Sequence, residues 1–358
     1  MIWFTGRQFR TPAMVAGGAL AIAAVILAIT GPHLVHVYDT AVATCAANGN
    51  CPTVTTAFLR LDRTLRVWLG ILVLVLPGIV GVFWGAPLVA REVEDGTFRL
   101  AWTQSVTRTR WLAVKLGVVG AAAVAATGLL SLMVTWWASP LDRVTQNRFG
   151  TFGQRDLVPL GYAAFAFALG ATIGALLRRT LPAMATTLVA FVAARLAATS
   201  WLRPRLIAPA HQTLALDPNS TGFGSSVSGL AGIIGGHGPT ASLQPGTPNI
   251  PGAWIYSTRI VNRQGRSLTS QVLTKDCPSL GGNGPRPSGS AARGPVPGDV
   301  QQALHDCVTK VGVNYHELVS YQPASRYWTF QWYETAIFMA AALILGGVCH
   351  WVVRRRIP

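Results

Sequence analysis

The chain has 358 residues, of which 51% are hydrophobic and only 12% are charged, and its formal net charge is +16. A soluble domain carries about 25% charged residues, so this composition favours a membrane protein over a soluble one. The positive charge does not indicate a nucleic-acid partner, because the arginines are scattered along the chain and flank apolar segments, as membrane anchors do.

Apolar segments long enough to cross a bilayer recur along the chain. A helical span needs about 20 apolar residues to cross roughly 30 Å of hydrocarbon. Six segments meet this length: 12–30, 67–90, 112–137, 158–177, 181–202 and 332–353. We therefore expect an all-α polytopic membrane protein with six transmembrane helices, the first five of them within 12–202.

The first apolar segment has some features of a signal peptide. Arg7 and Arg10 precede it, and Ala41-Val42-Ala43 resembles a cleavage site. However, the apolar run is longer than the apolar region of a signal peptide, and Ala41-Val42-Ala43 lies well beyond the end of this run. We interpret it as a retained span behind a short basic lead, residues 1–11.

The connection after the first span, 31–66, is expected to end in an amphipathic helix from Thr56 to Arg66 that lies near the membrane surface. Basic residues in short connections favour the cytoplasmic side. This rule places the N-terminus and the tail 354–358 in the cytoplasm of a cell whose plasma membrane holds the chain. The arginines of the connection 138–157, which is then outside, oppose this orientation.

The cysteines support the same orientation. Cys45 and Cys51 lie in the first connection, and Cys277 and Cys307 lie in the long connection 203–331. Both pairs would face an oxidising exterior, where disulfides persist, and a bridge across the second loop would contribute about 3 kcal/mol. Alternatively, they are unpaired thiols. A zinc site is not expected, because no Cys-x-x-Cys spacing occurs.

The connection 203–331 differs sharply in composition from the rest of the chain. Two stretches are rich in Gly, Pro and Ser: 217–252 and 278–298. Between them, Ala253 to Val261 has the pattern of a strand. Asp299 is a candidate N-cap for a helix over about 300–320. We expect a small, irregular extracytoplasmic domain here, between helices 5 and 6, followed by the last span at 332–353.

A mixed-charge turn, residues 91–110, joins the second and third spans. A span that ends at Ala90 should continue as helix until it reaches water, because backbone groups in hydrocarbon must be hydrogen-bonded. Gly96-Thr97 then interrupts the helix, since Gly can take a left-handed conformation and Thr can cap the next turn. Residues 98–110 are expected to lie along the membrane surface, with Trp102 and Trp111 at headgroup level.

The order of residues around this turn resembles the type-2 ATP-binding-cassette exporter permeases. The family pattern is an Arg-Glu-rich segment, then Gly-Thr, a Leu-containing turn, a Pro-Val-Ser-like step and a Lys early in the third span. The residues here that follow it are Arg91, Glu92, Glu94, Asp95, Gly96, Thr97, Leu100, Ser105-Val106 and Lys115. Gln104 replaces the usual Pro, and Arg99 stands where an acid is common. The segment from Tyr321 to Glu334 resembles the start of the last span in actinobacterial members.

This resemblance implies a permease subunit that exports an amphiphilic or lipid-like substrate. A separate cytosolic ATPase would dock on 91–110, with Arg99, Arg108 and Arg110 also at the contact. Two permeases, identical or different, would pair in the lipid bilayer. No Gly-x-x-x-x-Gly-Lys-[Ser/Thr] motif occurs, so the chain itself is expected to bind no ATP or other cofactor, and it presents no catalytic or metal-binding constellation.

Arg195 is a charged residue well inside a predicted span. An unpaired charge near the bilayer centre costs about 2.5–3.5 kcal/mol. By depth, Arg195 lies near the level of Glu334 in the last span. Three interpretations stay open: the two residues pair, Arg195 faces the translocation path and attracts an anionic group of the cargo, or its side chain extends to the outer headgroups.

Two alternatives to this interpretation remain. Residues 91–110 can be a basic cytoplasmic loop that merely obeys the orientation rule. The whole chain can also be a non-transporting membrane protein whose outer domain senses or binds a ligand. Small residues are compatible with close helix packing in either case: Gly78, Gly81, Gly85, Gly170 and Gly174.

Overall fold

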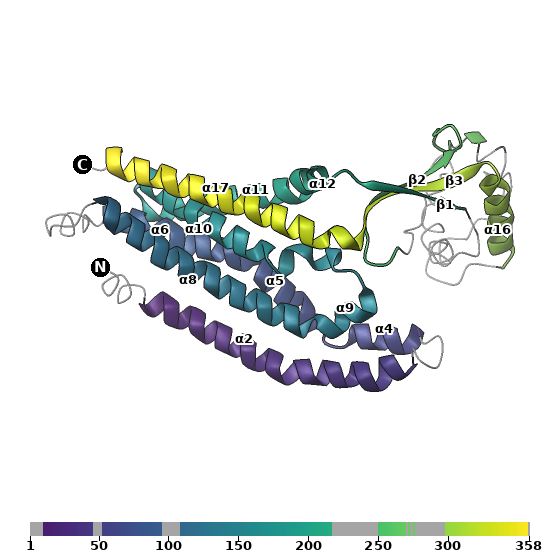
Figure 1. Ribbon diagram of the computed structural model, residues 1–358, viewed down its shortest axis with the longest axis horizontal. Coiled ribbons are helices and arrows are strands. Elements are labelled where there is room, and N and C mark those ends of the chain that lie inside the picture. Colours follow the sequence, from purple (N-terminus) through teal and green to yellow (C-terminus); the bar gives the residue numbers. More distant parts are fainter. Residues whose placement is uncertain are drawn as a thin grey trace. The chain divides into compact units, whose positions relative to one another are not determined.

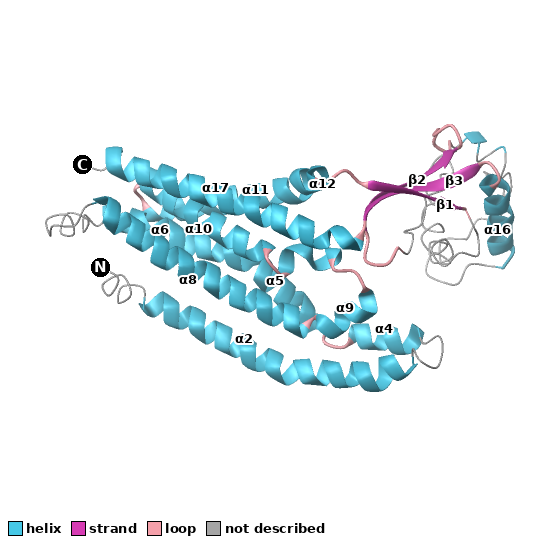
Figure 2. Cartoon of the chain, viewed as in Figure 1, coloured by secondary structure: helices cyan, strands magenta, loops and turns pink. Residues whose placement is uncertain are grey.

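The computed structural model describes residues 10–45, 52–94, 108–216, 250–269, 271–272, 275 and 298–356. The chain forms two compact units. The helical unit comprises Met1–Ile207 and Ser325–Pro358, and the sheet unit comprises Ala208–Ala324. Figure 2 shows strands only in the sheet unit, whereas the rest of the described chain is helical apart from short loops.

Six helices of the helical unit are long and apolar enough to cross a membrane, counting the described residues alone. These spans are Arg10–Ala43, Arg63–Glu94, Arg110–Trp137, Phe149–Leu177, Thr180–Leu206 and Ala324–Arg355. Their number confirms the six predicted spans. They are longer than predicted, because the hydropathy pattern detects only the apolar middle, while the helical hydrogen bonding continues into more polar flanks.

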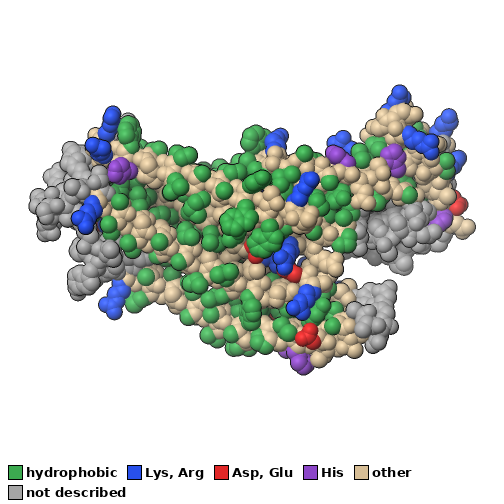
Figure 3. All heavy atoms as spheres, in the orientation of Figure 1, with side chains coloured by type: hydrophobic (Ala, Val, Ile, Leu, Met, Phe, Trp, Pro, Cys, Tyr) green, Lys and Arg blue, Asp and Glu red, His purple; other side chains and the backbone are tan. Residues whose placement is uncertain are grey.

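The elements of these spans, in chain order, are as follows: α2 (Arg10–Val37), η1 (Tyr38–Ala43), α5 (Arg63–Val80), η2 (Gly81–Gly85), α6 (Ala86–Glu94), α8 (Arg108–Trp137), η3 (Phe149–Gln154), α10 (Val158–Leu177), α11 (Thr180–Ala197), η4 (Ala198–Leu202), α12 (Arg203–Leu206), η7 (Ala324–Arg326) and α17 (Tyr327–Arg356). Two short helices connect them: α4 (Pro52–Arg60) and α9 (Ser139–Thr145). Large hydrophobic side chains such as Ile29, Leu181 and Leu343 are more than two-thirds exposed on the helical unit. The part of its surface visible in Figure 3 is hydrophobic along much of the helices' length.

The predicted amphipathic helix from Thr56 to Arg66 is wrong as a single element. Helix α4 ends at Arg60, and α5 begins at Arg63 and runs directly into the second span. Asp62 separates the two helices in the left-handed region, with φ of 49°. Asp tolerates this conformation better than most residues do, so a very short connection suffices to turn the chain before the span.

Helix α10 packs against most of the unit, and glycines bring its backbone close to η2 and α6. A Cβ atom on Gly170 would collide with the carbonyl oxygen of Gly81, and one on Gly81 would lie 2.6 Å from the carbonyl oxygen of Ala166. A Cβ atom on Gly85 would lie 2.5 Å from the carbonyl oxygen of Phe167. The predicted small-residue packing therefore operates within one subunit, where backbones meet without side chains between them.

The sheet unit contains three antiparallel strands in the order β1-β3-β2. They are β1 (Ala210–Ala215), β2 (Trp254–Asn262) and β3 (Tyr315–Gln322), and helix α16 (Gly298–Gly312) precedes the central strand. Strand β2 agrees with the predicted strand Ala253–Val261. The Gly/Pro-rich stretches lie almost wholly outside the described residues.

The predicted helix over 300–320 is wrong in its second half. Helix α16 ends at Gly312, and the residues after the turn at Val313 and Asn314 form β3. Along β3, Glu317, Val319 and Gln322 are buried between more exposed neighbours. Pairing with strands on both sides satisfies the backbone groups of this segment, which local propensity alone does not anticipate. Strand β1 was not predicted.

Candidate functional site

Two ends of the helical unit carry the predicted functional residues. At one end, α6 stops at Glu94 and α11 begins at Thr180; we call this the Glu94 end (Figure 1). At the opposite end, α9 and η3 connect α8 to α10; we call this the Asp142 end. The predicted coupling residues that the structure describes belong to the first end, and the predicted path residues lie toward the second.

Glu92 and Lys115 join the second and third spans at the Glu94 end. Lys115 Nζ forms an ion pair with Glu92 Oε1 and also lies 4.8 Å from the centroid of the Trp111 ring. The side chains of Lys115 and Glu92 are only 4% and 13% exposed. Because a buried ammonium group needs such partners, this pair fixes the end of α6 against the start of α8.

Glu94 makes a different contact, with the first residue of α11. Glu94 Oε2 accepts hydrogen bonds from the Thr180 backbone N–H at 2.9 Å and from the Thr180 hydroxyl at 2.7 Å. The residue before α11, Arg179, makes no side-chain hydrogen bond that would cap its N-terminus. The carboxylate of α6 therefore satisfies a free N–H group of another helix, where a negative charge also interacts favourably with the helix dipole.

The remaining predicted coupling residues are only partly described. Arg91 and Arg110 are exposed, and Arg108 is the first residue of α8. Asp95, Gly96, Thr97 and Arg99 lie outside the described residues, so the predicted break at Gly96-Thr97 and the surface helix that follows it stay predictions. The structure thus brings Glu92, Glu94 and Lys115 to one end of the unit, with Thr180 as a partner that the sequence did not indicate.

Toward the Asp142 end, Glu334 is fully buried and both its oxygens are occupied. Arg203 Nε donates to Oε2 at 2.8 Å, and Arg203 Nη2 donates to Oε1 at 2.9 Å. The Tyr162 hydroxyl also donates to Oε1, at 2.7 Å. This bidentate ion pair offsets much of the cost of burying the carboxylate.

Of the three interpretations of Arg195, the pair with Glu334 does not form. Arg195 Nη2 donates to the carbonyl oxygen of Gly153 at 3.0 Å, and its guanidinium carbon lies 4.3 Å from the centroid of the Tyr162 ring. Its Nη1 is buried without a hydrogen-bond partner among the described residues. Arg203 takes the carboxylate instead, because two planar N–H groups of its guanidinium align with both oxygens of Glu334.

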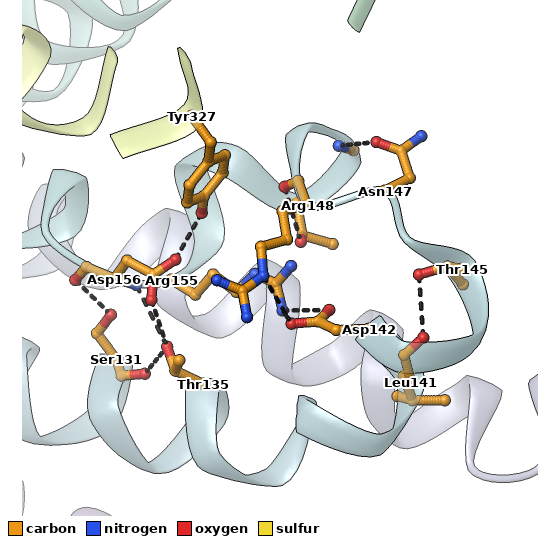
Figure 4. Close-up of polar contacts among 12 residues, drawn as sticks. Ser131, Thr135, Leu141, Asp142, Thr145, Asn147, Arg148, Arg155, Asp156 and Tyr327 are labelled. Carbon is orange, nitrogen blue, oxygen red and sulfur yellow. Dashed lines mark hydrogen bonds and ion pairs between the residues drawn. The ribbon is translucent and has the colours of Figure 1, made fainter. Parts of the chain in front are cut away.

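A second ionic cluster connects α9 to the start of α10 (Figure 4). Arg155 Nη1 donates to both carboxylate oxygens of Asp142, at 2.7 and 2.9 Å, and Arg148 Nε lies 3.4 Å from Asp142 Oδ2. Arg155 is only 3% exposed. Next to it, Asp156 accepts a hydrogen bond from the Tyr327 hydroxyl at 2.5 Å. These contacts fix the segment between α9 and α10 against α17.

Gln331 of α17 forms hydrogen bonds with the start of α10 and with η3. Its Oε1 accepts hydrogen bonds from the backbone N–H groups of Leu157 and Val158, at 3.1 and 3.0 Å, at the start of α10. Its Nε2 donates to the carbonyl oxygen of Phe152 at 3.1 Å. A residue of α17 therefore caps the N-terminus of α10, as Glu94 does for α11.

Of each predicted disulfide, only one cysteine lies within the described residues. Cys45 and Cys307 lie within the described residues, where neither is a free thiol. Cys51 and Cys277 lie outside them, so both pairings stay predictions. Cys349 is a buried, free thiol in α17. Over the described parts of the chain, no group of three or more His, Cys, Asp or Glu side chains is arranged to hold a metal ion.

Sequence reasoning missed several residues of these networks. Arg203 is the first residue of the predicted connection 203–331 and was not singled out, although an arginine beside a buried acid of another span is a candidate partner. Asp142 and Arg155 were treated as part of a polar connection. Thr180 carries no sequence pattern of its own. Gln331 and Tyr327 stood in the segment from Tyr321 to Glu334 that the family resemblance had singled out.

The fold and these contacts define a polytopic helical membrane protein whose charged residues mainly join helix ends. The model of one family, described as ABC-2 membrane transporter related, matches residues 17–203, which is 187 of 358 residues. The chain belongs to this family of transporter permeases. No curated protein and no solved structure is similar enough to match it. Membership confirms the resemblance to type-2 ATP-binding-cassette permeases and implies association with an ATP-binding-cassette ATPase.

Proposed function

We propose that this chain is the membrane-spanning permease subunit of an ATP-driven exporter. A separate ATPase subunit hydrolyses the ATP, and this chain binds neither nucleotide nor another cofactor. The observation that carries the proposal is the family match over residues 17–203, which includes the charged end of α6 and the start of α8. Export of an amphiphilic or lipid-like substrate rests on the family resemblance.

The ATPase docks on the segment 91–110. The Glu92–Lys115 ion pair supports this assignment, because it joins the spans on either side of the segment and makes their ends move together. Arg91 and Arg110 are exposed, so a partner surface can reach them. Closure of the ATPase on ATP would then tilt the second and third spans as a pair.

The Glu94 end faces the cytoplasm, with both termini, in the plasma membrane. The connection 138–157 and the sheet unit are then outside, where disulfides between Cys45 and Cys51 and between Cys277 and Cys307 are stable. The distribution of arginines supports this orientation.

The cargo path lies between two permease subunits, identical or different, and Arg195 attracts an anionic group of the cargo. Two features support this role for Arg195. It lies inside a span, and its guanidinium has no carboxylate partner among the described residues, since Arg203 occupies Glu334. Glu334 then has a structural role beside the path.

Co-purification tests the proposal most directly. The tagged full-length chain, extracted from its own membrane in mild detergent, should retain an ATPase subunit. The variants Glu92→Ala and Gly96→Pro should lose it, whereas Arg148→Ala, at the Asp142 end, should keep it. If the wild-type chain retains no ATPase, the proposed function is wrong. If Gly96→Pro retains the ATPase fully, the assignment of 91–110 as the docking segment is wrong.

Labelling tests the orientation. A cysteine introduced at Thr97 should react with a membrane-impermeant maleimide only after the cells are opened. Reaction on intact cells would reverse the proposed orientation. For the path, Arg195→Leu should reduce export and Arg195→Lys should retain more of it; unchanged export in Arg195→Leu would remove Arg195 from the path.

A further inference from the structure

One face of helix α11 points into the helical unit along its whole length. Ala183, Thr187 and Phe191 recur at helical spacing on this face and are buried. Thr180 and Arg195 continue the same spacing at its two ends. Each of these two end residues makes a polar contact with another part of the helical unit.

At the Glu94 end, α11 is joined to α6 by packing and by hydrogen bonds. Ala86, Ala90 and Ala183 are fully buried in one cluster, where the small side chains allow the helices to approach closely. Ala86, Ala90 and Glu94 are four residues apart and so share one face of α6. Glu94 therefore extends the packed face of α6 by one turn and ends it on Thr180.

At the other end of the face, Arg195 joins α11 to η3. Its Nη2 donates to the carbonyl oxygen of Gly153, and a Cβ atom on Gly153 would lie 2.7 Å from this nitrogen. The Arg195 guanidinium also lies over the Tyr162 ring, and Tyr162 donates to Glu334. Through Tyr162, the end of α11 is thus connected to Glu334 and its partner Arg203, toward the Asp142 end.

We propose that α11 carries movement of the end of α6 to the Asp142 end, and that the Glu94–Thr180 contact is the positioning contact that links α11 to this movement. The proposal rests on the proposed function, since the ATPase supplies the movement. From Thr180 to Arg195 the helix rises about 22 Å, because fifteen steps along the helix each rise about 1.5 Å. A displacement of its capped first turn is therefore transmitted along the helix.

The Glu94–Thr180 contact is partly exposed, which distinguishes a role in transmitting movement from a role in stabilising the fold. Glu94 is exposed and Thr180 is half-buried, and a polar contact at the surface contributes little to stability. The buried alanine cluster also packs the two helices together. Loss of the Thr180 hydroxyl should therefore leave the fold and ATPase binding intact and weaken only the transmission of movement.

The experiment uses the full-length chain purified with its ATPase. A cysteine at Ser200, an exposed residue just beyond α11, reports water access through its rate of reaction with a water-soluble maleimide. This rate is compared without nucleotide and with ATP plus orthovanadate. In the otherwise wild-type complex the two rates should differ by about fivefold or more, the usual lower range of coupling between sites. The chain without this cysteine gives the background.

Thr180→Val keeps the shape of the side chain and removes the hydroxyl. We expect it to lose part of the nucleotide-dependent difference, since the backbone N–H of residue 180 still donates to Glu94, while ATP hydrolysis stays within about twofold of wild type. Thr180→Ser, which restores the hydroxyl, should recover the difference. Thr186→Val is the matched control, because the Thr186 hydroxyl is exposed on the same helix and donates to the carbonyl of Pro182 within that helix.

The outcomes separate this inference from the proposed function. If the ATPase is retained and Thr180→Val keeps the full difference, the positioning role of the contact is wrong while the permease assignment stands. The role is also wrong if Thr186→Val loses the difference equally or Thr180→Ser fails to recover it. Failure of the wild-type chain to retain an ATPase overturns both this inference and the proposed function. Should Thr180→Val fold poorly, Thr180→Ala replaces it, since it also removes the hydroxyl that donates to Glu94 and should weaken the nucleotide-dependent difference in the same way.

Discussion

The helical unit and the sheet unit bury carboxylates in different ways. In the helical unit, Glu334, Asp142 and Glu92 each form an ion pair with a basic side chain. In the sheet unit, Glu317 is only 6% exposed, forms no ion pair with any described residue, and has an Oε1 without a hydrogen-bond partner. Burial raises the pKa of Glu317 to about 7.

This difference shows two solutions to the same physical problem. A buried charge is costly unless it is paired or neutralised. The helical unit pairs these three acids with basic side chains and so connects helices, whereas the sheet unit retains Glu317 partly as a neutral carboxyl group. Substitutions in the helical unit should therefore destabilise through unpaired charge, and those at Glu317 should change how stability depends on pH.

The largest effect is expected at Glu334. Glu334→Leu leaves the Arg203 guanidinium, 11% exposed, without its carboxylate, and breaking a buried pair on one side costs about 3–5 kcal/mol. Thermal denaturation in detergent should show this loss. The double variant Arg203→Met/Glu334→Leu should recover more than half of it. If the double variant is as unstable as the sum of the single ones, unpaired charge is not the cause.

Lys115 should have a smaller effect of the same kind. Lys115→Met leaves Glu92 without its ammonium partner, and because Glu92 is more solvated than Glu334 we expect a loss of about 2–3 kcal/mol. The retained amount of ATPase should also fall. Lys115→Arg preserves the charge and serves as the control; equal losses in both variants would point to shape rather than charge.

The backbone contact between α10 and η2 offers a test that involves no charge. Gly170→Val introduces a side chain where even a Cβ atom meets Gly81, and such overpacking costs about 1–3 kcal/mol. Gly346→Ala is the matched control, because nothing lies within 4 Å of its added Cβ atom. It should change stability by less than about 1 kcal/mol, since Ala favours helix. Equal melting temperatures for both variants would contradict the close packing.

The smallest effect is expected at Glu317. Its pKa is about 7 in the folded chain and about 4.3 when unfolded, so the folded state binds more protons between these values. Stability should therefore fall as pH rises from about 4 to 7 and stay low above. Glu317→Gln removes this dependence and should stabilise the sheet unit by about 1–2 kcal/mol at pH 8, with no gain near pH 4.

Thermal denaturation of the full chain at several pH values measures this difference. Asp306 in α16 is an exposed carboxylate of the same unit, so Asp306→Asn is a matched control that should leave the pH profile unchanged. If Glu317→Gln increases stability by the same amount at pH 4 and pH 8, protonation of Glu317 is not the cause.

Much of the helical unit follows directly from the sequence. Six apolar segments correspond to six spans, because hydropathy adds up locally and each span satisfies its own backbone hydrogen bonds. Glu92 in the charged turn and Lys115 early in the third span stand in the expected order, although their ion pair was not predicted. The sheet unit was less predictable: β1 was missed, and the end of the predicted helix over 300–320 became β3, since a strand depends on partners distant in the chain.

Composition and hydropathy by themselves determined that this protein crosses a membrane six times and where its charged turn lies, because both properties are sums over neighbouring residues. Only the tertiary structure decided which charges meet. Arg203, rather than Arg195, pairs with Glu334, and Thr180 donates hydrogen bonds to Glu94. Such choices depend on distances and angles between side chains from separate helices, which spacing along one helix does not fix.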